Sequence, residues 1–390
     1  MNKKINGPVN IVRLEGMGKV IYIMGDIHYC INHQLKCDDM EAANIDKYLY
    51  NFFKKTNKEN KEWDFMVEDS EFFNDYYTKE NIEYSNISYQ GYIWEIRRLL
   101  INNFNYKITN KEKLEVYNSK TFKNIRFHPI DIRSDRLAGY TYFNTSIYSI
   151  NNNRNIDWNI NLIKELEILK NDNNEFINIL NNKDKSKNKT LFDKFIYKNK
   201  NKYFNKNNQK IINNIIDTKV KKLYLDTLKL IDNLILIINK EYGEETKLWF
   251  SKDRKYKKYI NSMTDLKHFN WYEKSKQKIY NYLYNIQTNF VFLQLFIMDL
   301  YVIRRIVDKD YIKNVILYNG NSHFINTISI LVKEFGFKIT HIYDSKIKDI
   351  NKLNEKIKNE SYKNIVDNGL IEPEYITQCT DLKDFPEMFL

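Results

Sequence analysis

Four short runs of consecutive apolar residues constrain this fold more than any other feature of the sequence. They are KVIYIM (19–24), WDFMVE (63–68), IRFHPI (125–130) and NVILYN (314–319). Apolarity that is continuous, rather than alternating, is typical of strands covered on both faces, as in a parallel sheet between layers of helix. We therefore predict that these four runs are buried strands of one sheet.

A fifth predicted strand, FKITHIYD (337–344), follows a helical pattern that ends at Gly336, the expected C-terminal cap. Strand, helix and strand in this order form a βαβ unit, which implies a right-handed crossover and an α/β fold. Apolar residues recur at spacings of three and four over 158–180, 211–243 and 270–307, which predicts long helices. The expected fold class is α/β, a central mostly parallel sheet flanked by helices, with a large helical insertion before the last strands.

The expected organisation is one composite domain in three parts. Residues 1–150 form an N-terminal α/β half with the motif GDIH, residues 151–310 form the helical insertion, and residues 311–390 form a C-terminal α/β half with the motif GNSH. Within the insertion, Lys183–Lys210 contains ten lysines against two aspartates. We expect this segment to be a solvated, peripheral loop, with a binding patch for an anionic partner as the alternative.

Composition limits the classes of protein to which the chain can belong. Aromatic residues make up 15% of its 390 residues, which excludes a disordered protein. A net charge of +12 favours nucleic acid, an anionic membrane surface or phosphorylated ligands as partners. Part of this charge reflects genome composition, because the abundant Asn, Lys, Ile and Tyr share A- and T-rich codons.

Neither a signal peptide nor a membrane span is expected. The first residues lack the apolar core of a signal peptide, and charged residues interrupt the most apolar stretch, 290–307, which we expect to be a buried helix. Cys30, Cys37 and Cys379 form an odd set without a CxxC pair. This pattern predicts neither a disulfide framework nor a cysteine zinc site. Together these features predict a soluble protein in a reducing, intracellular compartment.

Two of the apolar runs end in the same short pattern, a glycine followed three residues later by a histidine. Gly25 and His28 end the first run, and Gly320 and His323 end the fourth. Glycine permits a tight turn after a strand, and ligand sites in open α/β sheets form at the carboxyl ends of the strands. We therefore expect both histidines at one edge of the sheet.

Charged residues follow the other two runs at the same predicted edge. Glu68 and Glu71 come at the end of the second strand, Asp131 ends the third, and Arg133 lies just beyond it. If the histidines meet, Asp131 is expected within about one water of them. Arg133 is the candidate to stabilise negative charge on a tetrahedral intermediate.

Two histidines and one or two carboxylates form a ligand set suited to Zn²⁺, Mn²⁺, Fe²⁺ or Co²⁺. We expect His28, Glu68 and His323 to bind a divalent metal, Mn²⁺ or Zn²⁺, as the cofactor. A metal with an open coordination position lowers the pKa of its bound water and polarises a carbonyl or phosphoryl oxygen. Asp26 and Glu71 are the candidates to orient a ligand histidine or to take a proton from that water.

The order of these motifs resembles a known superfamily. A strand ending in Gly-acid-x-His, a second ending in Glu and a late strand ending in Gly-x-x-His are similar to the superfamily of TraB proteins, Tiki proteases and erythromycin-esterase-like proteins. The resemblance rests on Gly25, Asp26, His28, Glu68, Gly320 and His323, with Asp26 in place of the more usual glutamate. It implies an α/β fold with a helical insertion and a hydrolytic site for peptide or ester bonds, which is metal-dependent in Tiki proteins. It also implies a large nucleocytoplasmic DNA virus as the source, and hence the cytoplasm of an infected cell or a virion as the location.

Two other interpretations stay open. GDIH also looks like the first block of calcineurin-like metallophosphoesterases, but Asn321 and Ser322 precede His323 and Phe324 follows it, so the Asn-His-Glu block of that family is missing. Alternatively, the chain keeps the fold without the chemistry and serves as an inactive virion component, a scaffold or a nucleic-acid binder. Its positive charge favours this last interpretation.

Other polar residues within apolar segments are expected to be structural. His128 and His341 lie inside predicted strands, where a histidine usually has a partner in the core. Asp299 is a lone acid on an apolar helix and must find a partner. The expected partner is Arg304, Arg305 or another buried base, and a position behind the metal site is the alternative.

Overall fold

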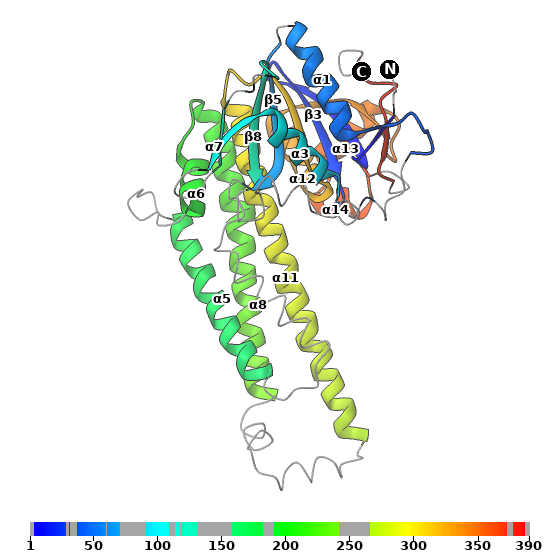
Figure 1. Ribbon diagram of the computed structural model, residues 1–390. Coiled ribbons are helices and arrows are strands. Elements are labelled where there is room, and N and C mark those ends of the chain that lie inside the picture. Colours follow the sequence, from blue (N-terminus) through cyan, green and yellow to red (C-terminus); the bar gives the residue numbers. More distant parts are fainter. Residues whose placement is uncertain are drawn as a thin grey trace. The chain divides into compact units, whose positions relative to one another are not determined.

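The fold divides into two compact units, and each is described by itself. The α/β unit comprises residues 1–132, 203–208 and 298–390, and the helical unit comprises residues 133–202 and 209–297. The computed structural model (Figure 1) describes residues 4–28, 31, 37–59, 61–70, 91–108, 114–117, 119, 121–131, 158–181, 191–241, 266–372 and 377–386.

A six-stranded sheet with the order β10-β2-β3-β9-β5-β8 forms the centre of the α/β unit. The pairs β3·β9, β9·β5 and β5·β8 are parallel, whereas β10·β2 and β2·β3 are antiparallel. The sheet is therefore mostly parallel, as predicted, and all five predicted strands belong to it. Its strands are β2 (Asn10–Gly16), β3 (Lys19–Asp26), β5 (Trp63–Ser70), β8 (Ile125–Asp131), β9 (Asn314–Gly320) and β10 (Lys338–Ile342).

The strand β2 was not among the predicted strands. It pairs with β3 through a two-residue turn at Met17 and Gly18, whose φ angles of 53° and 67° are both left-handed. Two such residues form the turn that matches the twist of a β-hairpin. This hairpin inserts β2 between β3 and β10, so β9 and β10 run in the same direction with two strands between them.

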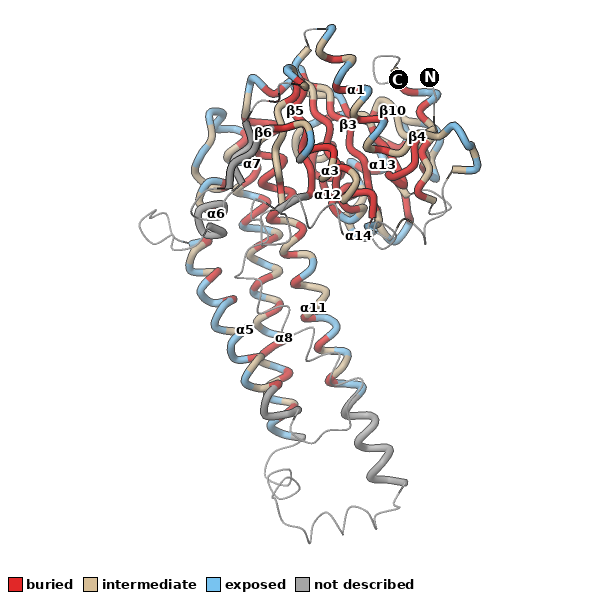
Figure 2. Tube along the Cα trace, viewed as in Figure 1, coloured by how far each residue is buried: buried red, intermediate tan, exposed pale blue. Residues whose placement is uncertain are grey.

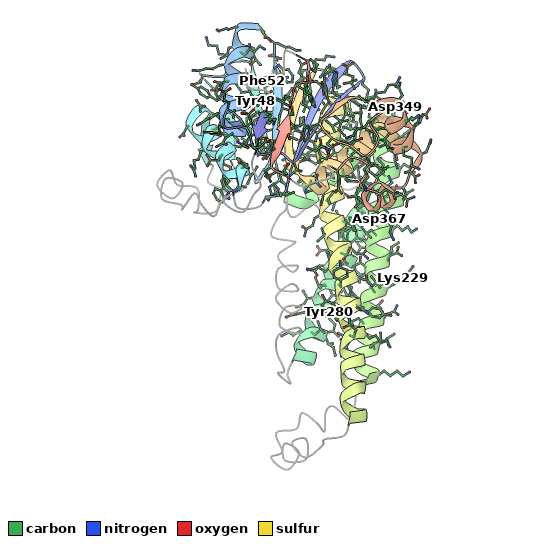
Figure 3. The ribbon with its side chains drawn as sticks, turned by 90° about the vertical axis from the view of Figure 1, so that its right-hand side faces the viewer. Tyr48, Phe52, Lys229, Tyr280, Asp349 and Asp367 are labelled. Atoms are coloured by element: carbon green, nitrogen blue, oxygen red, sulfur yellow. A yellow bond between two sulfur atoms is a disulfide. The ribbon has the colours of Figure 1, made fainter. Side chains whose placement is uncertain are left out.

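Helices cover both faces of the sheet. Aromatic side chains of β5 and of α1 (Ile45–Glu59) pack together on one face, where the rings of Phe52 and Trp63 lie 5.0 Å apart at near right angles. Tyr48 and Phe52 of α1 are labelled in Figure 3, and α3 (Tyr92–Asn103) adds further apolar residues to this core cluster. On β3 and β9 nearly every residue is buried (Figure 2), which explains why both strands read as continuous apolar runs. The C-terminal half also contains α12 (Asn321–Phe335), α13 (Ile350–Asn359) and α14 (Tyr362–Asp367).

The predicted long helices of the insertion are confirmed. They are α5 (Trp158–Asn181), α8 (Lys221–Glu241), which follows the π-helical turn η6 (Ile216–Val220), and α11 (Leu266–Asp308). The last of these crosses from the helical unit into the α/β unit, because its final residues, from Met298 onward, belong to the latter. No helix in the described ranges is long and apolar enough to span a membrane.

The loop predicted over Lys183–Lys210 is wrong for the residues that the structure describes. Most of them form α6 (Leu191–Asn201) and the start of α7 (Lys206–Ile215). Ile196 and Asn199 of α6 are buried, so the high lysine density concealed a helix with one packed face. Between these helices, the backbone N–H groups of Phe204 and Asn205 donate to the buried carboxylate of Asp308, at 2.9 and 3.0 Å.

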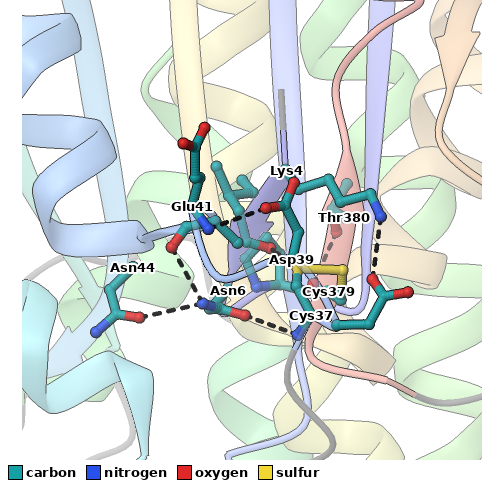
Figure 4. The surroundings of a disulfide bond; sticks show 12 residues. Lys4, Asn6, Cys37, Asp39, Glu41, Asn44, Cys379 and Thr380 are labelled. Carbon is teal, nitrogen blue, oxygen red and sulfur yellow. Dashed lines mark hydrogen bonds and ion pairs between the residues drawn. A yellow bond between two sulfur atoms is a disulfide. The ribbon is translucent and has the colours of Figure 1, made fainter. Parts of the chain in front are cut away.

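A small second sheet joins the two ends of the chain. Its order is β11-β1-β4, formed by Cys379–Asp381, Lys4–Asn6 and Ala43–Asn44. Beside it, Cys37 and Cys379 form a disulfide (Figure 4), so the prediction of no disulfide is wrong. The two cysteines are 342 residues apart, and the pairing of β1 with β11 and a 2.9 Å hydrogen bond from the Cys37 N–H to Asn6 bring them together. A separate antiparallel hairpin consists of β6 (Asn105–Ile108) and β7 (Leu114–Tyr117).

Candidate metal centre

The carboxyl ends of three adjacent parallel strands bring the predicted metal ligands together. Asp26 ends β3 and pairs in register with Gly320, which ends β9, while Glu68 lies near the end of β5. His28 follows β3 by two residues, and His323 lies in the first turn of α12. All five residues belong to the α/β unit.

His28 contacts two carboxylates. Its Nδ1 lies 2.9 Å from Oδ2 of Asp26, and its Nε2 lies 3.3 Å from Oε2 of Glu68. The backbone of His28 is left-handed, with φ of 53°, a conformation that histidine adopts more often than most residues. Asp26 is fully buried, and its other oxygen, Oδ1, accepts a hydrogen bond of 2.8 Å from the side-chain amide of Gln378. The ring of His28 is therefore held on a carboxylate that is itself fixed.

The electrostatics around His28 favour a positive charge. Burial by itself lowers the pKa of His28, but the hydrogen bonds to Asp26 and Glu68 and their negative charges outweigh it and raise the pKa to about 10. Two carboxylates on one imidazole thus create a position where a cation is stabilised. A divalent metal ion satisfies the same electrostatic preference.

His323 also contacts two carboxylates, and it faces the other oxygen of Glu68. Its Nδ1 lies 2.8 Å from Oδ1 of Asp299, and its Nε2 lies 3.6 Å from Oε1 of Glu68. Asp299 comes from α11 and is 1% exposed, and its Oδ2 accepts a 2.6 Å hydrogen bond from the amide of Asn326. Burial raises the pKa of Asp299, an effect that the neighbouring His323 opposes.

Asp299 pairs with a buried base, as expected, but this base is His323 and not an arginine. Its partners are His323 and Asn326, one turn apart on α12. Arg305 instead donates to the hydroxyl of Tyr301 and contacts His128. Asp299 therefore lies behind the candidate site, which was the alternative that the sequence left open.

The two histidines share one geometry, with Nδ1 on a buried carboxylate and Nε2 toward Glu68. In a neutral imidazole, a carboxylate at Nδ1 keeps the one remaining proton on that nitrogen, and the Nε2 lone pair is then free to bind a metal. In a tetrahedral site with metal–ligand distances near 2.0 Å, neighbouring ligand atoms are about 3.3 Å apart, close to the two N···O separations here. The nitrogens face different oxygens of Glu68, and within the described ranges no three such groups are arranged to hold an ion as the side chains stand. As they stand, the side chains form a hydrogen-bonded cluster around Glu68, whose residue types are those that bind divalent metals.

Gly320 contacts the side chains of the candidate site directly. Its N–H donates to Oε2 of Glu68 at 2.6 Å and fixes one end of that carboxylate. A Cβ at this position would lie 3.1 Å from Nε2 of His28 and 3.2 Å from Oε2 of Glu68. A methyl group here would therefore crowd both side chains, which would have to move by a few tenths of an ångström.

The structure describes only one of the three remaining predicted site residues, Asp131. Asp131 ends the edge strand β8, half-buried and in register with Ser70. Glu71 and Arg133 lie outside the described residues, so their roles stay predictions. Sequence reasoning missed Asn326 and Gln378, the amides that hold the two buried carboxylates. Asn326 follows His323 by three residues, a helical spacing that could have revealed it, whereas no local signal marks Gln378.

A second polar cluster on the sheet accounts for His128. Its Nε2 lies 2.7 Å from Asp64, and its Nδ1 lies 2.9 Å from Nη2 of Arg305. Asp64 also accepts two hydrogen bonds, of 2.9 and 2.7 Å, from Arg126. His341 contacts Thr340 at 3.0 Å. Both histidines have structural partners, as predicted.

Comparisons with known proteins find relatives of this chain in a giant virus. A family model described as a family of unknown function (DUF5847) matches residues 3–390. The uncharacterized protein R161 of Acanthamoeba polyphaga mimivirus is 29% identical, over 99% of this chain and 98% of the relative. The uncharacterized protein R706 of the same virus is also 29% identical, over 100% of this chain and 97% of the relative. No solved structure matches the chain significantly. These matches confirm the giant-virus kinship and bear on no activity.

Proposed function

Since the chain belongs to DUF5847, a family of unknown function, we propose from its site that it is a metal-dependent hydrolase of peptide or ester bonds. The observation that carries the proposal is the pair of imidazoles that share Glu68. Each has its Nδ1 on a buried carboxylate and its Nε2 directed at the same acid. Proteins use this carboxylate–histidine arrangement to orient metal ligands.

In this proposal His28, His323 and Glu68 hold Mn²⁺ or Zn²⁺. When bound, the ion makes its water more acidic and polarises the carbonyl that is attacked. Asp26 and Asp299 fix the tautomer and the orientation of the two rings. Both oxygens of Asp26 are engaged, so this residue is suited to positioning His28 rather than to accepting a proton.

One further consideration supports a hydrolase. The motifs of this site are those that resemble the TraB, Tiki and erythromycin-esterase-like superfamily, and they come together at one edge of the sheet. Glu71 and Arg133 are the proposed proton acceptor and the group that stabilises negative charge. The cytoplasm of an infected cell or a virion is the proposed place of action.

The test compares two histidine variants. We expect the wild-type protein and His341→Ala, whose histidine lies outside the site, to bind one Mn²⁺ or Zn²⁺ per chain. His323→Ala should bind none; it should melt below His341→Ala, because the buried Asp299 loses a partner, and its circular dichroism spectrum should show that it is folded. Elemental analysis, calorimetric titration and a panel of peptide and ester substrates provide the measurements. A wild-type protein without bound metal and without a metal-dependent shift in melting would instead support an inactive scaffold.

A further inference from the structure

Gln378 connects the candidate site with the disulfide. Its side-chain amide donates to Asp26 Oδ1 at 2.8 Å, and both residues are buried, with 1% and 0% of their surface exposed. The next residue, Cys379, is bonded to Cys37. The disulfide, which a thiol can reduce, is therefore adjacent in sequence to Gln378, the residue that holds Asp26.

The strand that carries Cys379 is short, and different contacts hold its two ends. β11 is three residues long and lies at the edge of its sheet, where it pairs on one side with β1. The carbonyl of Gln378 accepts from Gly7 at 3.1 Å, and the hydroxyl of Thr380 donates to Pro8 at 2.7 Å. Leu382 and Phe385, just beyond β11, are buried in the core cluster and hold its C-terminal end. The N-terminal end, beside Gln378, is held by the disulfide and by these hydrogen bonds, each of which contributes modestly.

The disulfide is also accessible. Cys37 and Cys379 are both half-buried and line a surface cavity of about 560 Å³. Charged residues surround it, among them Lys4, Asp38 and Lys383. Figure 4 shows the bond beside Asn6 and Lys4. A reductant can therefore reach the sulfur atoms without unfolding the sheet.

We propose that the Cys37–Cys379 disulfide is a redox switch for the metal site and acts through Gln378. A dithiol reductant opens it by exchange: its two thiols become one disulfide, and Cys37 and Cys379 each become a thiol, so that two electrons and two protons are transferred. The Gln378 amide then moves away from Asp26. Since a buried carboxylate that loses a hydrogen bond is destabilised, Asp26 shifts, His28 loses its fixed orientation, and metal affinity falls. This regulation rests on the function proposed above.

The experiment compares metal affinity in the two redox states. All proteins carry Cys30→Ser, so that Cys37 and Cys379 are the only cysteines. One sample is oxidised; the other is reduced with a phosphine, alkylated with iodoacetamide and freed of reagents. We expect at least tenfold weaker Mn²⁺ binding after reduction. In Gln378→Ala, the oxidised protein should already bind Mn²⁺ weakly. Reduction should then change its affinity by less than about twofold, well below the roughly 10- to 100-fold loss expected when a ligand loses its orienting partner.

Thr380→Ala serves as the matched control, because Thr380 lies on the same strand and contacts Pro8 rather than the site. It should keep the full redox effect. Circular dichroism and melting curves establish whether the reduced proteins are folded. Ring-nitrogen NMR shifts of His28, recorded without metal, report its hydrogen bond to Asp26 independently of any metal.

The outcomes separate the switch from the proposed function. Unchanged Mn²⁺ affinity in a folded, reduced protein overturns the switch and leaves the metal site intact. An equal redox effect in Gln378→Ala, or wild-type affinity in its oxidised form, overturns the route through Gln378 even if reduction loosens the fold. If no form binds Mn²⁺, the proposed metal site fails; a shift of the His28 ring signals on reduction then still supports the switch, and unchanged signals overturn it.

Discussion

Replacing Gly320 with alanine adds one methyl group to the centre of the candidate site. The new Cβ would lie 3.1 Å from Nε2 of His28 and 3.2 Å from Oε2 of Glu68, closer than the 3.4 Å at which ordinary contacts begin. The backbone itself tolerates the change, because φ of −61° and ψ of 151° suit any residue. The two ligands must therefore shift by a few tenths of an ångström.

The effect on stability should be small. Overpacking costs about 1–3 kcal/mol, and the lower entropy of the unfolded chain with alanine offsets about 0.4–1 kcal/mol of that. We expect the free energy of unfolding to fall by no more than about 2.5 kcal/mol. Metal affinity should fall much further in relative terms, by about 10- to 100-fold, because displaced ligand orientation has effects of that size.

Gly336→Ala is the matched control. Gly336 caps α12 with a left-handed φ of 69°, and a Cβ there would meet no atom within 4 Å. The variant should lose about 1–2 kcal/mol through backbone strain and keep its metal affinity. Calorimetric titration with Mn²⁺ or Zn²⁺ and chemical denaturation measure the two quantities. Wild-type affinity in Gly320→Ala, or an equal loss in both variants, would refute the geometry assigned to this site.

Three further predictions concern the buried polar groups. Asp299→Asn should weaken Mn²⁺ binding about 10- to 100-fold in a calorimetric titration, because an amide no longer enforces the tautomer of His323; unchanged affinity would remove Asp299 from the site. Burial is the main cause that lowers the pKa of His128 below 6.5 in the folded state, so the unfolded chain takes up the proton first. Stability should therefore fall as pH drops from 6.5 toward that lower pKa, and melting curves of His128→Asn should lack this fall. Arg126→Ala strips two hydrogen bonds from the fully buried Asp64 and should cost about 3–5 kcal/mol in chemical denaturation; a loss no greater than that of Arg126→Lys would contradict this assignment.

The sequence revealed strands wherever burial is continuous on both faces. KVIYIM and NVILYN, at the centre of the sheet, are such runs. The strand β2 escaped because its sequence, NIVRLEG, contains Arg13 and Glu15, which are partly or fully exposed near the end of the strand. The two edge strands, β8 and β10, were predicted from their apolar runs, so the miss at β2 reflects its charged residues and not its place in the sheet.

The candidate site was predictable where residues directly follow strands. His28, Glu68 and His323 each come at the carboxyl end of a buried run, and parallel topology brings those ends together. For Asp299 the sequence indicated only that a buried acid needs a partner. It could not identify His323, because that contact joins two helices across 24 residues. The contact of Gln378 with Asp26 spans 352 residues, and no local pattern can record a pairing of that range.

The place of β9 between β3 and β5 has a consequence for how the chain folds. Both neighbours are made early, yet the strand that joins them begins only at Asn314, roughly 240 residues after the end of β5. At a synthesis rate of about 5–20 residues per second, the ribosome needs about 12–50 s to make that interval. During this time β3 and β5 present unpaired edges, which invite pairing with other chains. The helical unit is synthesised within the same interval, so it can fold locally while the sheet waits for its central strand, and any truncation before β9 leaves a nascent chain prone to aggregate.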